Sequence, residues 1–330
     1  CLEPVRLVNG GGKVRHPLLL EAVLRFQANA RSELLPTDGP VKIRDESNNS
    51  GAELDKLASA LEKDMNHYLT VTATEYYPDT DRMLFMVGFG GDGFKKVFFC
   101  PLRNRPVAES IDAEDLIVNN SATDLENSRR ITHRIMMKPS VVKRMQIIGA
   151  YRDIPLSEPG APSLNAAQEE RNAQQGVSNT VMNHEDRDRE IYECYCELDI
   201  KGFEHQWKKK ASGLEVPYRV TVDVSSRQIL SIVRNYEEGD DLPTARKVFV
   251  KYPFVPGLGF YDIGLLHILG NTTNAVTAAW RELLDAGMFA AFPGFLMADQ
   301  GARQNTNIFR VPPGGSATVK TNGMKISDAI

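Results

Sequence analysis

The stretch Tyr192-Glu-Cys-Tyr-Cys-Glu-Leu-Asp-Ile200 alternates between apolar and polar side chains. Successive side chains of a β-strand point to opposite faces of a sheet, so this period of two predicts a half-buried strand. We expect the buried face to carry Tyr192, Cys194, Cys196, Leu198 and Ile200, and the polar face to carry Glu193, Tyr195, Glu197 and Asp199.

Three more strand-like runs follow, at residues 216–224, 228–236 and 247–252. The polar pair Ser225-Ser226 separates the first two, as is typical of an antiparallel connection. The sequence therefore predicts an antiparallel β-meander over residues 190–250. The segment 151–189 before it is poor in large apolar residues, which is typical of a solvated connection.

The first 150 residues predict a mixture of helices and strands. Residues 16–35 and 51–77 have apolar side chains at spacings of three and four, which indicates two amphipathic helices. Short strands are expected within 107–137, and a further helix over 139–148.

Two short apolar runs, Met83–Phe89 and Phe94–Cys100, flank the turn-like sequence Gly90-Gly-Asp-Gly93. This pattern predicts a β-hairpin. The glycines also match G-x-G-x-x-G from Gly88 to Gly93, but a dinucleotide site needs a helix after the glycines. The strand-like residues that follow favour the hairpin, and we expect no cofactor.

A long helix is predicted over residues 261–290, after a break rich in proline and glycine at 253–259. One apolar stripe at helical spacing consists of Leu265, Ile268, Leu269, Thr272, Val276, Ala279, Leu283 and Ala286. Much of the remaining surface is small or neutral, because it carries glycine, asparagine and threonine. Together with the meander, this helix predicts an α+β fold.

Composition excludes several classes of protein. The chain has 330 residues and a formal net charge of −4, and a protein that grips DNA tightly usually shows a basic surplus. Four cysteines are too few for a disulfide scaffold, and no apolar run is long enough to span a membrane. Because the chain starts at Cys1, we expect a fragment of a longer polypeptide.

No catalytic or metal site is predicted. The spacing of Cys194 and Cys196 differs from the C-x-x-C of zinc sites, and the six histidines are scattered. The carboxylates form no recognisable acid–base pair, and neither a G-x-S-x-G motif nor a phosphate loop is present.

Lys208, Lys209 and Lys210 form a basic cluster beside Trp207. The cluster is a candidate contact for nucleic acid or for an acidic partner. A solvated hairpin loop between two strands explains the same residues, and both interpretations stay open.

Segments across most of residues 14–296 resemble portal proteins of tailed phages with short tails, the podovirus type. The resemblance rests on their order and total coverage. Its main segments are His16-Pro-Leu-Leu, Gly93-Phe-Lys-Lys-Val97, Ala113-Glu-Asp-Leu-Ile-Val118, Thr123-Asp-Leu-Glu126, Arg189-Glu-Ile-Tyr-Glu193, Tyr252-Pro-Phe-Val-Pro-Gly257 and Leu283-Leu-Asp-Ala-Gly287.

The resemblance implies a non-enzymatic ring, usually of twelve subunits, at one vertex of the virion head and assembled in the host cytoplasm. Double-stranded DNA would pass through it without sequence specificity. The implied partners are the terminase large subunit, a head–tail adaptor and the capsid or scaffold protein. In portal terms, 1–150 is expected to be the wing or outer body, 151–189 a polar connection, 190–250 the clip, 251–305 the stem and tunnel, and 306–330 the start of a truncated region.

A channel for DNA should hold phosphates weakly, and a neutral helix face rich in asparagine and threonine fits that need. We expect five residues of the long helix to face the lumen or a neighbouring subunit: Asn271, Thr273, Asn274, Thr277 and Arg281. The alternatives are another phage structural protein, such as a tail adaptor or coat subunit, and a phage DNA-processing enzyme.

Overall fold

The computed structural model describes residues 14–44, 52–160, 169–170, 172–173, 176, 187–207, 210–291, 295–298 and 316–319. The chain divides into two compact units. The sheet unit spans Val23–Gly264, and the helix unit consists of residues 1–22 and Leu265–Ile330. Mixed helices and antiparallel strands confirm the predicted α+β class.

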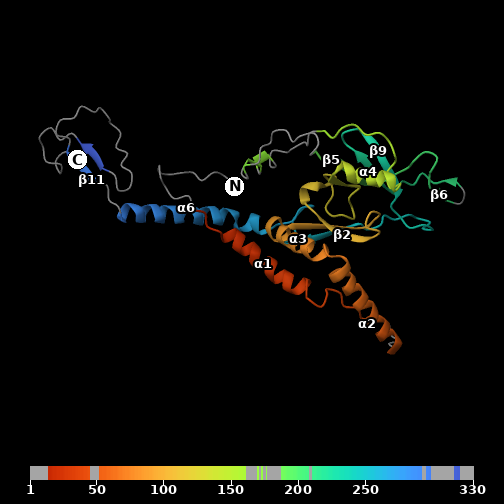
Figure 1. Ribbon diagram of the computed structural model, residues 1–330, viewed down its shortest axis with the longest axis horizontal. Coiled ribbons are helices and arrows are strands. Elements are labelled where there is room, and N and C mark those ends of the chain that lie inside the picture. Colours follow the sequence, from red (N-terminus) through yellow and green to blue (C-terminus); the bar gives the residue numbers. More distant parts are fainter. Residues whose placement is uncertain are drawn as a thin grey trace. The chain divides into compact units, whose positions relative to one another are not determined.

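The sheet unit contains two antiparallel sheets (Figure 1). The three-stranded sheet has the order β10-β1-β2, made of Phe249–Pro253, Asp92–Cys100 and Arg105–Ile111. The five-stranded sheet has the order β3-β4-β5-β8-β9, made of Leu116–Val118, Arg130–Met137, Arg189–Leu198, Val216–Asp223 and Gln228–Arg234. A separate small hairpin pairs β6 (Gln206–Trp207) with β7 (Lys210–Ala211).

Helices precede, interrupt and follow these sheets. The first is α1 (Leu18–Leu34), which crosses the boundary between the units; α2 (Ala52–His67) continues as a π-helical turn over Tyr68–Thr72. They are followed by α3 (Tyr76–Gly90), a 3₁₀ turn at Ala113–Asp115, α4 (Pro139–Ile147) and α6 (Leu265–Ala291). In the helix unit, β11 (Phe295–Ala298) pairs in parallel with β12 (Ser316–Val319). The helices predicted at 16–35, 139–148 and 261–290 are therefore confirmed.

The predicted hairpin at residues 83–100 is wrong. Only its second half is a strand, whereas Met83–Phe89 belongs to α3. The buried residues of α3 recur at helical spacing; they include Thr80, Met83, Leu84 and Val87. This period starts before residue 83, so the seven residues 83–89 taken alone are too short to reveal a helix. Gly91 ends the helix at φ 103°, where its N–H bonds to the Val87 carbonyl, so the glycine run is a helix C-cap.

The four-stranded meander is also wrong. β5, β8 and β9 are consecutive antiparallel neighbours as predicted, but β10 pairs with β1 in the other sheet. In addition, β4 pairs with β5 along its whole length, from Arg130↔Cys196 to Met137↔Arg189. β4 comes before the polar connection and β5 after it, so strands from both sides of the connection share one sheet. Alternation predicts that a segment forms a strand, but it does not predict the strand with which it pairs.

The buried face of β5 is the opposite of the predicted one. Its buried residues are Arg189, Ile191, Glu193 and Tyr195, whereas Cys194 and Cys196 are half-buried. Charge normally opposes burial, but two of these side chains have buried partners of opposite charge. Hydropathy alone therefore assigned the wrong face.

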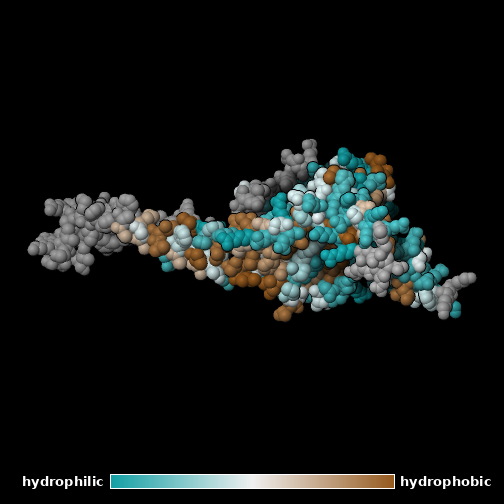
Figure 2. Space-filling model, turned by 90° about the horizontal axis from the view of Figure 1, so that it is seen from below, coloured by the Kyte–Doolittle hydropathy of each residue, from teal (hydrophilic) through white to brown (hydrophobic). Residues whose placement is uncertain are grey.

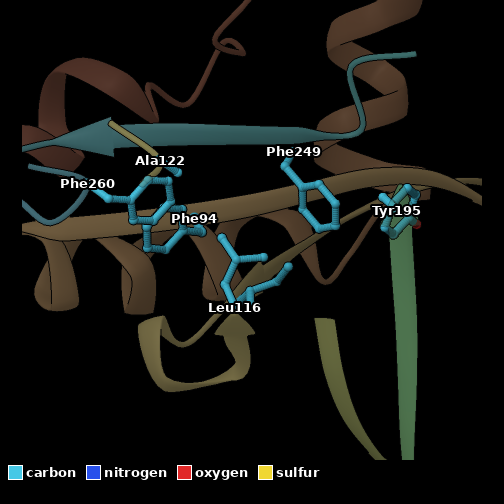
Figure 3. Packing of buried hydrophobic residues seen from close by; sticks show 7 residues of the cluster. Phe94, Leu116, Ala122, Tyr195, Phe249 and Phe260 are labelled. Atoms are coloured by element: carbon cyan, nitrogen blue, oxygen red, sulfur yellow. The ribbon is translucent and has the colours of Figure 1, made fainter. Parts of the chain in front are cut away.

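The main core draws residues from both sheets, as Figure 3 shows. Phe94 of β1 is fully buried and stacks on Phe260, with ring centroids 5.8 Å apart and planes 5° apart. Tyr195 of β5 meets Phe249 of β10 edge to face at 4.9 Å. A second cluster, Val142, Tyr151, Ile191 and Leu230, packs α4 against the five-stranded sheet.

We expect Phe94→Ala to destabilise the protein by about 3–5 kcal/mol, because it removes a buried ring and leaves a cavity between the sheets. Urea unfolding followed by fluorescence measures this. Phe99→Ala on the same strand is the matched control, since Phe99 is 59% exposed, and should stay within about 0.5 kcal/mol of the original chain. Equal losses in the two variants would contradict the assignment of the core.

Candidate channel helix and charged tip

Helix α6 of the helix unit is 27 residues long and has two distinct faces. Asn271 and Asn274, three residues apart, are exposed on a polar arc that also contains Glu282. On the apolar stripe, Leu283 is 73% exposed and Ile268 is 52% exposed. Figure 2 shows brown apolar surface along α6 beside teal polar surface.

The structure places the five predicted channel residues in different surroundings. Asn271 and Asn274 are exposed, and the Thr273 hydroxyl donates to the Leu269 carbonyl one turn earlier, at 2.8 Å. Thr277 is only 9% exposed, and its hydroxyl accepts a hydrogen bond from the backbone N–H of His16 at 3.2 Å.

Arg281, the fifth of these residues, is held by the same N-terminal segment. Its Nε donates to the Val14 carbonyl at 2.8 Å, and the rings of His16 and Trp280 lie 5.2 Å apart. Residues 14–17 therefore cover one side of α6 within the helix unit. That the five residues face a lumen or a neighbour stays a prediction.

The sheet unit buries several ion pairs, of which Lys96–Glu193 is the most enclosed pair between the sheets. The Lys96 ammonium bonds to Glu193, and the Tyr195 hydroxyl donates to the same carboxylate at 3.3 Å. Burial acts to raise the pKa of Glu193, but Lys96, Arg219 and His133 outweigh it and hold the pKa below its usual value.

A second charged group lies just before α6. Lys251 of β10 is 2.7 Å from Asp262 Oδ2 and 3.5 Å from Asp92 Oδ1, and Asp92 Oδ2 accepts the Asp262 N–H at 2.9 Å. Burial raises the pKa of Asp92. The pKa of Asp262 is lowered despite its burial, because the Gly257 N–H and Lys251 favour its charged form.

Two glycines cross beside this group. A Cβ on Gly91 would lie 2.5 Å from the Asp262 carbonyl oxygen, and one on Gly264 would lie 2.4 Å from the Gly91 nitrogen. Only glycine permits so close an approach of two backbones, and Gly91 also has a positive φ. The crossing and the Lys251 group together fix the backbone immediately before α6.

A small cavity of about 140 Å³ in the sheet unit is lined by several carboxylates and by His133. Its acidic side chains already have partners: Asp79 accepts from Ser110, Asp115 pairs with Arg134, and Asp112 lies 3.6 Å from Arg82. Throughout the described ranges, no group of three or more His, Cys, Asp or Glu is placed to hold a metal ion. The cavity is therefore part of the charged packing between the sheets.

The β6–β7 hairpin and the loop 235–247 form a charged tip. Lys208 and Lys209 lie outside the described residues, and Lys210 is exposed at the start of β7. An open groove of about 660 Å³ is lined by residues of both segments, including Trp207, Leu214 and Leu242. Sequence analysis missed the exposed acidic run Glu237–Asp241 on the neighbouring loop, although its composition alone could have revealed it.

Residues 100–330 match the protein family described as "Phage SU10 portal protein". The chain belongs to this family of phage portal proteins. The match spans the whole five-stranded sheet, β2 and β10 of the three-stranded sheet, the charged tip and α6. It confirms the predicted resemblance to phage portals and identifies a structural, non-enzymatic family whose members are capsid-associated oligomers of the virion.

A comparison with curated proteins finds no match for the chain. Among the helices that the structure describes, none combines the length and apolar character needed to cross a bilayer.

Replacing Lys96 tests whether the stabilities contributed by Lys96 and Glu193 depend on each other. We expect Lys96→Met to cost about 3–5 kcal/mol, because it leaves the Glu193 carboxylate buried without its base. Adding Glu193→Met should recover much of that loss in urea unfolding. Lys247→Met, in the exposed Lys247–Glu126 pair, is the control and should change little. Additive losses in the double variant would contradict a coupled pair.

The stability of the protein should fall as the pH is lowered from about 6.5 towards 4. Burial and the nearby Lys96 charge lower the pKa of His133 to about 4 from 6.5. Over this window the unfolded chain binds the proton and the folded chain does not, so the stabilisation is present above 6.5 and lost on acidification.

His133→Gln should flatten this slope, measured as the free energy of unfolding in urea between pH 6.5 and 5. His67→Gln on the exposed side of α2 is the control and should keep the original slope. An unchanged slope in His133→Gln would show that His133 is not held neutral.

Proposed function

We propose that this chain is a subunit of a portal ring at one capsid vertex, with twelve copies enclosing a channel for double-stranded DNA during packaging and ejection. The observation that supports this most directly is α6, whose apolar stripe is in large part exposed within the single chain while its polar arc is amide-rich. Large exposed apolar surface marks an interaction site. A head-to-tail contact between identical subunits closes into a ring when the rotation permits.

The polar arc is suited to a passing polyanion. Asn271 and Asn274 are uncharged, so they would contact phosphates without the salt-dependent affinity that lysine or arginine adds. We propose these two as channel-lining residues. Thr273, Thr277 and Arg281 would lie nearer a subunit boundary, since Thr277 and Arg281 already contact residues 14–16.

The remaining assignments follow the portal architecture. We propose that residues 1–150 contain the wing, that 190–250 contain the clip, and that 251–305 form the stem and tunnel segment. Lys208, Lys209 and Lys210 would lie at the exposed end of the clip. The terminase large subunit, a head–tail adaptor and the capsid or scaffold protein are the proposed partners of the assembled ring.

Leu283→Asp tests the role of the apolar stripe. A carboxylate there would have to be buried at each subunit contact, so we expect ring formation to be lost while the single chain stays folded. Negative-stain class averages and light scattering of the full-length protein measure assembly, and circular dichroism checks the fold.

Asn274→Asp is the matched control, because it places the same charge on the polar arc of the same helix. It should leave the ring intact. Rings of normal abundance from Leu283→Asp would rule out the stripe as the contact. A full-length protein that stays monomeric, or forms a lattice or a solid tube, would refute the portal assignment.

A further inference from the structure

The loop of residues 255–263, which follows β10 in the sheet unit, is closed on itself by backbone contacts. An isolated antiparallel bridge pairs Val255 with Ile263, and the Ile263 N–H donates to the Val255 carbonyl at 2.9 Å. Within the loop, the Gly257 N–H donates to Asp262 Oδ1 at 2.9 Å. A Cβ on Gly257 would lie 2.5 Å from a backbone oxygen across the turn, so the turn requires glycine. The loop therefore has a defined backbone.

The sheet unit holds this loop from its inner side. Phe260 is buried and stacks on Phe94, and the Lys251 ammonium donates to the Phe260 carbonyl. Asp262 is buried as well; its N–H donates to Asp92 Oδ2 at 2.9 Å, and its carboxylate lies 2.7 Å from the Lys251 ammonium. Aromatic packing and a buried charged group thus anchor the loop, so its shape is fixed before any partner binds.

The outer side of the loop is apolar, which reverses the usual distribution of side chains. Leu258 is fully exposed, Tyr261 is 54% exposed, and Val255 and Ile263 are about as exposed as each other, at 40% and 39%. The only charged residue of the loop is Asp262, and it is buried. A preformed apolar surface without charge is typical of the centre of a protein–protein contact.

We propose that this loop is a contact between adjacent copies of the chain, in which Leu258 and Tyr261 pack against apolar surface of the next copy. The inference rests on the proposed ring and adds a second contact to the one on the apolar stripe of α6. Every copy would make the contact once with its neighbour, as a closed ring of head-to-tail subunits requires.

The sequence that follows the loop favours a second copy as the occupant. Only Gly264 separates Ile263 from Leu265, where α6 begins, and the stripe of α6 is the proposed contact between copies. Exposed apolar residues continue along the chain into that helix, since Leu266 is 41% exposed and Ile268 is 52% exposed. A subunit that packs through α6 therefore carries the loop, by covalent connection, to the boundary with the next copy.

The same surface is unsuited to DNA. Nucleic acids are bound chiefly through lysine and arginine contacts to phosphate, and the loop contains neither residue. The lysine nearest in sequence, Lys251, is largely buried and already paired with Asp262. Apolar side chains of another subunit would need no such charge, because burial of apolar surface itself favours the contact.

Leu258→Asp tests the contact. The side chain is fully exposed in the single chain, so we expect the variant to fold normally. It should need at least about tenfold more protein to form rings, because a carboxylate would have to be buried at every contact. Light scattering and negative-stain images of the full-length protein measure assembly, and thermal unfolding checks the fold. Leu242→Asp is the matched control on another exposed loop of the sheet unit and should assemble like the original chain.

A photoreactive side chain at position 258 identifies the occupant directly. Rings are formed from a mixture of two differently tagged full-length chains, of which only one carries Leu258→benzoylphenylalanine, and are then irradiated. We expect cross-linked pairs that contain both tags. The same residue at position 242 is the control and should give no such pairs. This measurement decides the question even where Leu258→Asp fails to fold.

Rings that form from Leu258→Asp at the original protein concentration would overturn the inference while leaving the portal assignment intact. Irradiated rings without cross-links between copies would overturn it in the same way. An original chain that forms no rings at all would refute the proposed function, and the inference with it.

Discussion

The sheet unit depends on one buried ion pair between its two sheets. Lys96 of β1 and Glu193 of β5 belong to different sheets and are both nearly inaccessible to water, so each charge is tolerable only because the other is present. The Lys96 ammonium also lies 4.6 Å from the centroid of the Phe98 ring on its own strand. Sliding either strand by one residue would turn its charge to the opposite face and leave the partner unpaired.

The same ion pair explains why the sequence alone predicts the wrong buried face for β5. Alternation located the strand correctly, but hydropathy assigned Glu193 to the solvent and Cys194 to the core. The identity of the buried face depends on a lysine nearly a hundred residues earlier, and that long-range match is invisible in a local pattern. β10 shows the same limit: its residues predict a strand, but its pairing with β1 and the packing of Phe249 against Tyr195 and His133 of the other sheet involve residues far away in the sequence.

The local sequence pattern predicted the helix unit more successfully than the sheet unit. The bounds of α6 follow from its apolar period and from the glycine and proline break before it, both of which are local. The surroundings of individual side chains were not predictable, because Thr277 and Arg281 are engaged by residues more than two hundred and sixty positions earlier. Among the predicted channel residues, Asn271 and Asn274 are the exposed pair. Helical spacing places Thr273, Thr277 and Arg281 on a neighbouring stripe, but it does not predict that the N-terminal segment covers Thr277 and Arg281.

The distribution of charge in this chain suits the proposed channel, which would have to pass DNA without holding it. In the sheet unit, lysines 95, 96 and 251 are directed inward against carboxylates, so they add nothing to an attractive surface for phosphate. In the sequence of the charged tip, the three lysines Lys208–Lys210 are offset by four carboxylates within Glu237–Asp241, so these two segments together carry little net charge. In the proposed channel, a duplex would therefore meet few free lysines from these segments to slow its passage.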